Sequence, residues 1–339
     1  MENNTRIYTF DLKNAYTSVV VRDGKVWRIE VHDGQCTRGY SPSEYRELLS
    51  SDRRLTDEVL HECELAQPDI FRNFIPRDIV VHGGLFHMDD VLCAVLCRIA
   101  NPAVRIARKN NPETEIEIAD IDLGIIVADV GGVYDPERGL FDHHQDKYTA
   151  ESDPATVRAA VGRLWDTLGN VENYPGLTAF IHAVDLHDTG VSWTPLGVLG
   201  AFAPNWDETG ATMDDGFEAA VQYLLPLVRR LILKDEADRR AVEAVAACQR
   251  EDGVIIMEKF LPWQEYAAQH EEIRAVVFPG RDPGTWNISI PKGRGLFPAS
   301  WLEPANKPDG MVFMPAWRTM CVANSPDKAK EFATHIVAN

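Results

Sequence analysis

Residues 125–145, with the sequence IIVADVGGVYDPERGLFDHHQ, place an apolar strand directly before acids and imidazoles. The run 125–127 leads into Asp129 and then into Gly131-Gly132. β-Branched residues followed by glycines predict a buried strand that ends in a turn. Asp142-His143-His144 follows thirteen residues after Asp129. Because ligands in open α/β sheets bind at the carboxyl ends of strands, this stretch predicts a ligand site.

Two further segments carry donors of the same kind. His82-x4-His87-x-Asp89 follows a short apolar run, and the helical segment HAVDLHDTG can present His182, Asp185, Asp188 and Thr189 on one face. Imidazole and carboxylate together favour Mn, Fe, Co or Zn over Ca. Such a set of donors suits a dinuclear centre, in which a shared carboxylate bridges two ions about 3.5–4 Å apart.

Strand and helix patterns alternate from residue 77 onward, which predicts an α/β fold with a doubly wound, mostly parallel sheet. Strands are expected at 78–82, 104–107 and 124–129, and helices at 90–100 (capped by Asp89), 152–168 and 174–188. A long helix is expected over 213–250. Beyond it, strands at 253–258, 273–278 and 285–290 and helices at 261–271 and 325–337 predict a smaller C-terminal α/β lobe.

The first 75 residues are expected to form an accessory module. The Asp23-Gly24 pair between β-rich runs predicts a hairpin over 17–31, and a polar helical stretch follows at about 42–63. No catalytic constellation is visible there. The predicted domains are therefore 1–75 (accessory), 76–210 (catalytic), 211–250 (helical connector) and 251–339 (substrate-binding lobe).

The net charge and the apolar pattern of the chain limit the kinds of partner that it can bind. The formal charge of −18 opposes non-specific binding to a long duplex, whose affinity rests on Lys and Arg contacts with phosphates. It leaves room for a small or short substrate, because metal ions supply positive charge locally. With no apolar leader, no membrane span and six cysteines outside any C-x-x-C pattern, a cytoplasmic protein with reduced thiols is expected.

The blocks HGGLFHMDD, DVGGVYDPERGLFDHHQ and VDLHDTG resemble the DHH phosphoesterase superfamily, and the middle block resembles its melanocyte-proliferating-gene family. The resemblance covers roughly residues 78–339. It implies a two-lobe fold and metal-dependent phosphodiester or phosphoanhydride hydrolysis, with two divalent ions, Mn²⁺ expected and Mg²⁺ or Co²⁺ as alternatives. Eukaryotic relatives are described as 3′–5′ RNA exonucleases.

The resemblance also implies roles for individual residues. One metal would be bound by His82 and His87, and the other by Asp89 and His143, with Asp129 and Asp185 bridging or shared. Asp185 is favoured over Asp188 because it holds the first-acid position of the family's D-x-x-D-x-G pattern. His144 would face the substrate phosphate, Asp142 would orient His143, and Arg108 would contact phosphate.

The C-terminal lobe departs from the family pattern, with Met314 where a histidine is expected. Three functions therefore stay open. The first is a phosphodiesterase, exonuclease-like, acting on short single-stranded RNA or DNA or on small nucleotides. The second is a pyrophosphatase or phosphomonoesterase, and the third is a catalytically idle interaction protein that keeps the metal fold. The sequence leaves the oligomeric state undefined.

Overall fold

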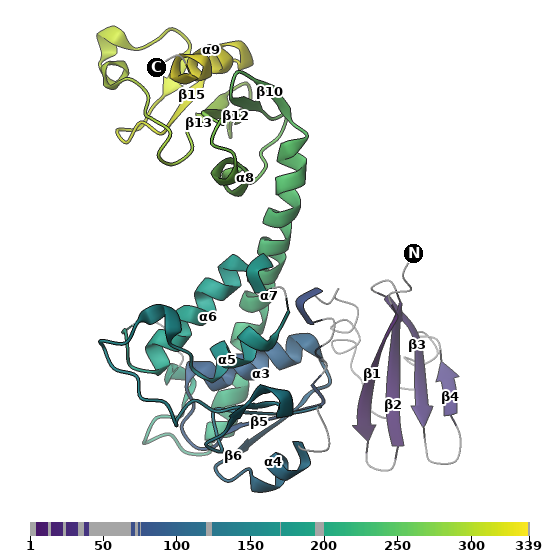
Figure 1. Cartoon of the computed structure of the whole chain (residues 1–339). Helices are drawn as coiled ribbons and strands as arrows, with labels where there is room; N and C mark the ends of the chain where they lie inside the picture. Colours follow the sequence, from purple (N-terminus) through teal and green to yellow (C-terminus); the bar gives the residue numbers. More distant parts are fainter. Residues whose placement is uncertain are drawn as a thin grey trace. The chain divides into compact units, whose positions relative to one another are not determined.

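A computed structural model describes residues 5–12, 15–22, 25–32, 37–40, 69–71, 74, 76–119, 124–169, 171–193 and 200–337 (Figure 1). The chain divides into two units, Met1–Leu233 and Lys234–Asn339, and each is described by itself. The four-part domain division expected from the sequence stays a prediction.

The N-terminal strands form a separate antiparallel sheet in the order β1-β2-β3-β4. They are β1 Thr5–Leu12, β2 Ala15–Arg22, β3 Lys25–His32 and β4 Thr37–Tyr40. The hairpin predicted over 17–31 is confirmed, because β2 and β3 pair from Tyr16↔His32 to Arg22↔Lys25. The helix predicted over 42–63 lies outside the described residues.

The second sheet has the strand order β6-β5-β7-β9-β8. Its strands are β5 Asp78–His82, β6 Arg105–Lys109, β7 Ile125–Ala128, β8 Tyr134–Asp135 and β9 Leu140–Phe141. Strand β5 runs parallel to β6 and β7, β9 runs parallel to β7, and only β8 at the edge is antiparallel. The predicted α/β class with a mostly parallel sheet is therefore confirmed.

Helices cover both faces of this sheet, as a doubly wound fold requires. Ile79 and Val81 of β5 pack in one core with the buried face of α3 (Met88–Ala100). Val80 points the other way, into a smaller core with Ile116 of α4 (Glu113–Ala119). Alternate residues of a strand face opposite sides of the sheet, so a continuously apolar β5 serves both layers. Figure 1 shows α3 and α4 on opposite sides of the strands.

The single helix predicted over 152–168 is wrong. A 3-10 turn spans Pro154–Thr156, the chain is extended at Val157, and α5 runs only from Ala160 to Thr167. The reason lies in α6 (Pro175–Asp188), whose Asp185 Oδ1 accepts the backbone N–H groups of Ala159 and Gly162. This carboxylate satisfies donors that a helix N-terminus leaves unpaired, and it fixes the start of α5.

Helix α7 (Met213–Ala246) continues from the first unit into the second and contains Pro226, which removes one intrahelical hydrogen bond. None of the described helices combines the length and the apolar character that a membrane span needs.

The second unit holds a six-stranded sheet in the order β10-β11-β12-β13-β15-β14, with its helices α8 (Gln264–Gln269) and α9 (Pro326–Val337). The strands are β10 Gln249–Glu251, β11 Val254–Ile256, β12 Ala275–Pro279, β13 Trp286–Ser289, β14 Met311–Phe313 and β15 Met320–Ala323. The three predicted strands and two predicted helices are present. The sequence pattern missed β10, β14 and β15, which are too short to show periodicity, and the start of β10 falls in the stretch that was expected to end the long helix.

Candidate metal centre

The candidate site lies at the carboxyl edge of the parallel strands. His82 ends β5, Asp129 follows β7 directly, and Asp142 follows β9 directly. His87 stands at the N-cap of α3, where the chain leaves the same edge. Three neighbouring strands and one helix start thus deliver imidazoles and carboxylates to one place, as expected at the reversal of strand order in a doubly wound sheet.

The turn after β7 explains the double glycine. Asp129 itself has a left-handed backbone, with φ of 59°, a conformation that Asp tolerates better than most residues. Gly132 also has a positive φ, of 70°, and its N–H donates to Asp142 Oδ2 at 2.6 Å. The turn therefore fixes both Asp129 and the start of the Asp142-His143-His144 segment.

His143 is the centre of the cluster. Its Nε2 lies 3.1 Å from Asp188 Oδ2, 3.2 Å from Asp129 Oδ1 and 3.7 Å from Asp89 Oδ2. Two groups of three possible metal donors meet around it, and all donor atoms within a group lie within 4.8 Å of one another. One group is Asp129, His143 and His144, and the other is His87, Asp89 and Asp188.

Asp89 was expected to cap the helix that it precedes, but it lies inside the first turn of α3. The capping role falls to Asp90, whose Oδ1 accepts the His87 N–H at 3.2 Å. The side chain of Asp89 is thereby released from the backbone and is completely buried. Asp188 is the third donor of the group that contains His87 and Asp89, and its Oδ1 lies 3.7 Å from His87 Nδ1.

The cluster carries more buried negative charge than the protein compensates. Burial, followed by the carboxylates of Asp129 and Asp188, raises the pKa of Asp89 well above its ordinary value. Burial works to lower the pKa of His143, but the carboxylates of Asp129 and Asp188 close to its ring raise it to about 9. Both shifts have the same physical cause, since protons here balance carboxylates that would otherwise be buried as unpaired charges.

Several polar atoms of the cluster are buried without a hydrogen-bond partner. They are both carboxylate oxygens of Asp89, Oδ1 of Asp129 and Nε2 of His143. Buried polar atoms are almost always hydrogen-bonded, so a convergent set of orphans calls for a missing partner. Lone pairs on oxygen and nitrogen that face one another fit a divalent cation, which replaces the protons.

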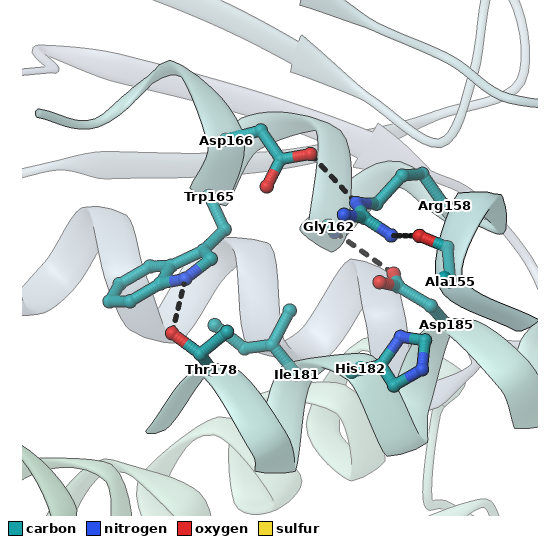
Figure 2. A pocket seen from close by; sticks show the side chains of 9 residues that line it. All are labelled: Ala155, Arg158, Gly162, Trp165, Asp166, Thr178, Ile181, His182 and Asp185. Atoms are coloured by element: carbon teal, nitrogen blue, oxygen red, sulfur yellow. Dashed lines mark hydrogen bonds and ion pairs between the residues drawn. The ribbon is translucent and has the colours of Figure 1, made fainter. Parts of the chain in front are cut away.

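Asp185, which the sequence analysis favoured as a ligand, lies outside both donor groups. Figure 2 shows its carboxylate directed at Gly162 at the start of α5, beside a pocket of about 180 Å³ that also contains His182 and the Arg158–Asp166 ion pair. Asp188, one helical turn further along α6, stands in the place assigned to Asp185. The D-x-x-D spacing alone gives no sign that the first acid is used as a helix cap.

The expected role of Asp142 also needs correction. Its Oδ1 lies 2.7 Å from Nδ1 of His144, not of His143, and accepts the backbone N–H of His144 at 2.9 Å. Arg163 of α5, which sequence reasoning missed, donates to the Asp142 carbonyl at 2.7 Å and pairs with Asp146. This arginine is buried at the inner face of a short helix, and a cation on an otherwise apolar face was the signal available.

Two other expected residues lie nearby with different partners. Arg108, at the strand end of β6, donates to Asp214 Oδ1 at 2.6 Å and to the Gly84 carbonyl at 2.5 Å. Its guanidinium thus holds the loop between His82 and His87, and its contact with phosphate stays a prediction. His82 lies outside both donor groups. Its Nδ1 is 3.2 Å from the Leu85 carbonyl oxygen, so an Nδ1–H donor would leave Nε2 for a metal.

The segment that carries most of these donors matches a known protein family. Residues 78–170 match the model of the "Uncharacterised protein family (UPF0160)", MYG1_exonuc. This segment contains β5 to α5 and all of the donors described above except those of α6. The match confirms the resemblance to the melanocyte-proliferating-gene family.

Similar proteins carry the same name. A "MYG1 protein" of Chlamydia muridarum is 30% identical over 206 residues, which cover 56% of this chain and 66% of that protein. One of Chlamydia pneumoniae is 28% identical over 200 residues, covering 56% and 67%. The human "MYG1 exonuclease" is 43% identical over 77 residues, covering 22% and 19%. The chain thus spans about two thirds of the bacterial relatives and about a fifth of the human one.

Solved structures give weaker similarities. A pGpG-specific phosphodiesterase, PggH, from Vibrio cholerae aligns with 78% of this chain and 99% of its own, at a TM-score of 0.28 and 14% identity. RecJ with Mn²⁺ from Thermus thermophilus aligns with 77% and 51%, at a TM-score of 0.24 and 15% identity. TM-scores this low do not establish a common fold. The family model and the named relatives carry the comparison: over residues 78–170, this chain is similar to the MYG1 exonuclease family, UPF0160.

Proposed function

We propose that this protein is a divalent-metal-dependent phosphodiester hydrolase that trims short single-stranded nucleic acid from the 3′ end or cleaves small nucleotides. The observation that carries the proposal is the pair of three-donor groups that meet at His143, with buried oxygen and nitrogen atoms that lack hydrogen-bond partners. Two adjoining donor sets are the arrangement that two-metal phosphoryl chemistry needs.

We assign the two donor sets to two metal ions. His87, Asp89 and Asp188 would hold one, and Asp129 and His143 would hold the other, with His82 as an additional donor. When bound, a pair of divalent ions, Mn²⁺ by preference, lowers the pKa of an attacking water and offsets charge on the phosphate. Asp129 and Asp188 both approach Nε2 of His143 within 3.2 Å, so either carboxylate is placed to be shared.

His144 is the proposed contact with the scissile phosphate. The carboxylate of Asp142 is hydrogen-bonded to Nδ1 of His144, which leaves Nε2 of that ring available to a ligand. The His144 side chain is 56% exposed, whereas that of His143 is 8% exposed. An exposed, oriented imidazole can donate to a phosphoryl oxygen, while its buried neighbour serves the metal.

The proposed substrate follows from charge and from the relatives. A formal charge of −18 disfavours a long polyanion, whereas a short strand held at metal ions needs few basic side chains. The mammalian relatives are named exonucleases. Hydrolysis of short RNA or DNA is therefore favoured over a pyrophosphatase role.

The test is digestion of 5′-labelled RNA and DNA oligonucleotides of graded length with added Mn²⁺, by the wild-type chain and by the Asp129→Asn and Asp188→Asn variants. Stepwise shortening from the 3′ end is expected, with loss of activity in both variants. An Asp207→Asn variant, which neutralises an exposed acid of the same unit, should match the wild type. Equal activity of Asp129→Asn and the wild type would overturn the proposed centre.

A further inference from the structure

The second unit contains a pocket of about 340 Å³ that the proposed reaction does not use. Its walls come from four segments: Arg274 directly before β12, the loop 294–298, Arg318 two residues before β15, and the last turn of α9. Its volume falls within the range of small-molecule sites, about 300–1,000 Å³. It is lined by Arg274, Arg294, Gly295, Leu296, Phe297, Pro298, Arg318, His335 and Ile336.

The polar side chains of this pocket are all basic. Arg274, Arg294 and Arg318 are half-buried, and none of them forms an ion pair in the described part of the chain. The side chain of Arg274 has no hydrogen bond there either. Three guanidinium groups without a carboxylate partner around one cavity are unexpected in a protein with a net charge of −18, and they give the cavity a positive potential that favours an anion.

The arginines have different local roles. Arg294 is committed to the backbone, because its guanidinium donates to the carbonyl groups of Ala267, His270 and Glu271. Arg318 makes one such bond, from Nη1 to the Phe297 carbonyl at 3.0 Å, and its backbone is left-handed with φ of 56°. This conformation is unfavourable for arginine, and such outliers concentrate at ligand sites. Arg274 and Arg318 are thus the groups available to a ligand.

The pocket lies at one end of the six-stranded sheet, and the strand directions show which end it is. Strands β12 and β15 each pair antiparallel with β13 and therefore run in the same direction. Arg274 and Arg318 precede these strands, so they lie at the amino end, where α9 finishes with His335 and Ile336. The start of α9, after β15, lies at the opposite end. No donor of the metal centre contributes to this pocket.

We propose that this pocket binds the phosphate group of a small phosphorylated ligand of mononucleotide size, with Arg274 and Arg318 as its cationic contacts. Guanidinium groups bind phosphate with paired, charge-assisted hydrogen bonds. Phe297, which lines the loop wall, stacks on Trp301 with the ring centroids 5.6 Å apart. The proposal does not depend on hydrolysis at the metal centre.

The experiment is calorimetric titration of the full chain, in EDTA, with adenosine 5′-monophosphate, inorganic phosphate and adenosine. The monophosphate should bind, inorganic phosphate should compete with it, and adenosine should not bind. Arg274→Gln and Arg318→Gly should each weaken binding about tenfold, the loss expected for one charge-assisted contact. Because φ of 56° suits glycine, Arg318→Gly removes the cation without straining the fold.

Two controls separate the pocket from other sites. Arg281→Gln removes an exposed arginine of the same unit and should leave the affinity unchanged. Asp129→Asn alters the metal centre and should also bind the monophosphate normally. No binding at about 1 mM, a weak affinity by any standard, would overturn the proposal. So would equal effects of Arg274→Gln and Arg281→Gln, or loss of binding in Asp129→Asn.

Discussion

Asp142 Oδ1 lies 2.7 Å from Nδ1 of His144, and the same oxygen accepts the backbone N–H of His144. The other oxygen of Asp142 accepts the Gly132 N–H. These contacts hold the pKa of Asp142 below its ordinary value, although burial alone would raise it. One carboxylate thus joins the turn after β7 to the ring that we expect to face the substrate.

Replacing Asp142 by Asn should lower activity without removing metal donors. An amide group cannot accept all three N–H groups, so either the His144 ring or the Gly132 turn loses its partner. We expect kcat to fall about 10–100-fold, the usual cost of losing a group that orients a functional side chain. Steady-state kinetics together with metal analysis checks this, since unchanged kcat would show that the ring needs no such support.

Metal binding should distinguish Asp188 from Asp185. Asp188→Asn removes a donor of the group that contains His87 and Asp89, so its Mn²⁺ affinity should fall by about 100-fold or more, at least the cost of losing an outer partner. Asp185→Asn keeps an oxygen that can accept the N–H groups of Ala159 and Gly162, and its affinity should fall far less. Equilibrium dialysis measures both. The reverse order would restore Asp185 as the ligand.

Gly162 should tolerate no side chain. A Cβ at this position would lie 2.3–2.6 Å from the carboxylate atoms of Asp185. Gly162→Ala should therefore destabilise the protein by about 1–3 kcal/mol, the cost of overpacking a tight site. Gly169→Ala is the matched control, because nothing lies within 4 Å of its Cβ position. Urea unfolding of the two variants compares them, and equal stabilities would contradict the contact.

Asp185 should make stability depend on pH. Burial raises the pKa of Asp185 to about 7 from an ordinary value of 3.8, against the two N–H groups that lower it. Between these pH values the folded protein holds a proton that the unfolded chain has lost. The free energy of unfolding should therefore fall as pH rises from about 4 through about 7, by a few kcal/mol at most.

The variant Asp185→Asn isolates this contribution. Its amide carries no charge, so its stability relative to the wild type should increase between pH 5 and pH 8.5. Urea unfolding at both pH values, in EDTA, gives the comparison. A difference between variant and wild type that stays constant over this range would mean that Asp185 does not titrate there.

Strand and helix types in the α/β region followed from the sequence because apolar periodicity there is strong. DIVVH and IIVA read as buried strands, and the structure has them at 78–82 and 125–128. The break before α5 did not follow, because it depends on a carboxylate that arrives from α6, 26 residues away from Ala159. A helix boundary set by a distant side chain leaves no trace in local propensity.

The candidate site, like the fold, could be predicted from the sequence only in part. The residue types and strand ends of His87, Asp89, Asp129 and His143 could be read from the chain, and the structure brings these four together. The choice between Asp185 and Asp188 could not, because both lie on α6 and differ only in what packs against them. The partner of Asp142 was equally hidden, since His143 and His144 are adjacent and only the turn decides which ring it meets.

The contact between Gly162 and Asp185 also limits how the two positions can vary during evolution. A longer residue at 162 becomes acceptable only after the acid at 185 is lost, and loss of that acid leaves the start of α5 without its acceptor. Each single step therefore passes through a less stable protein. Among related chains, the two positions should change as a pair, and a glycine at 162 should accompany an acid at 185.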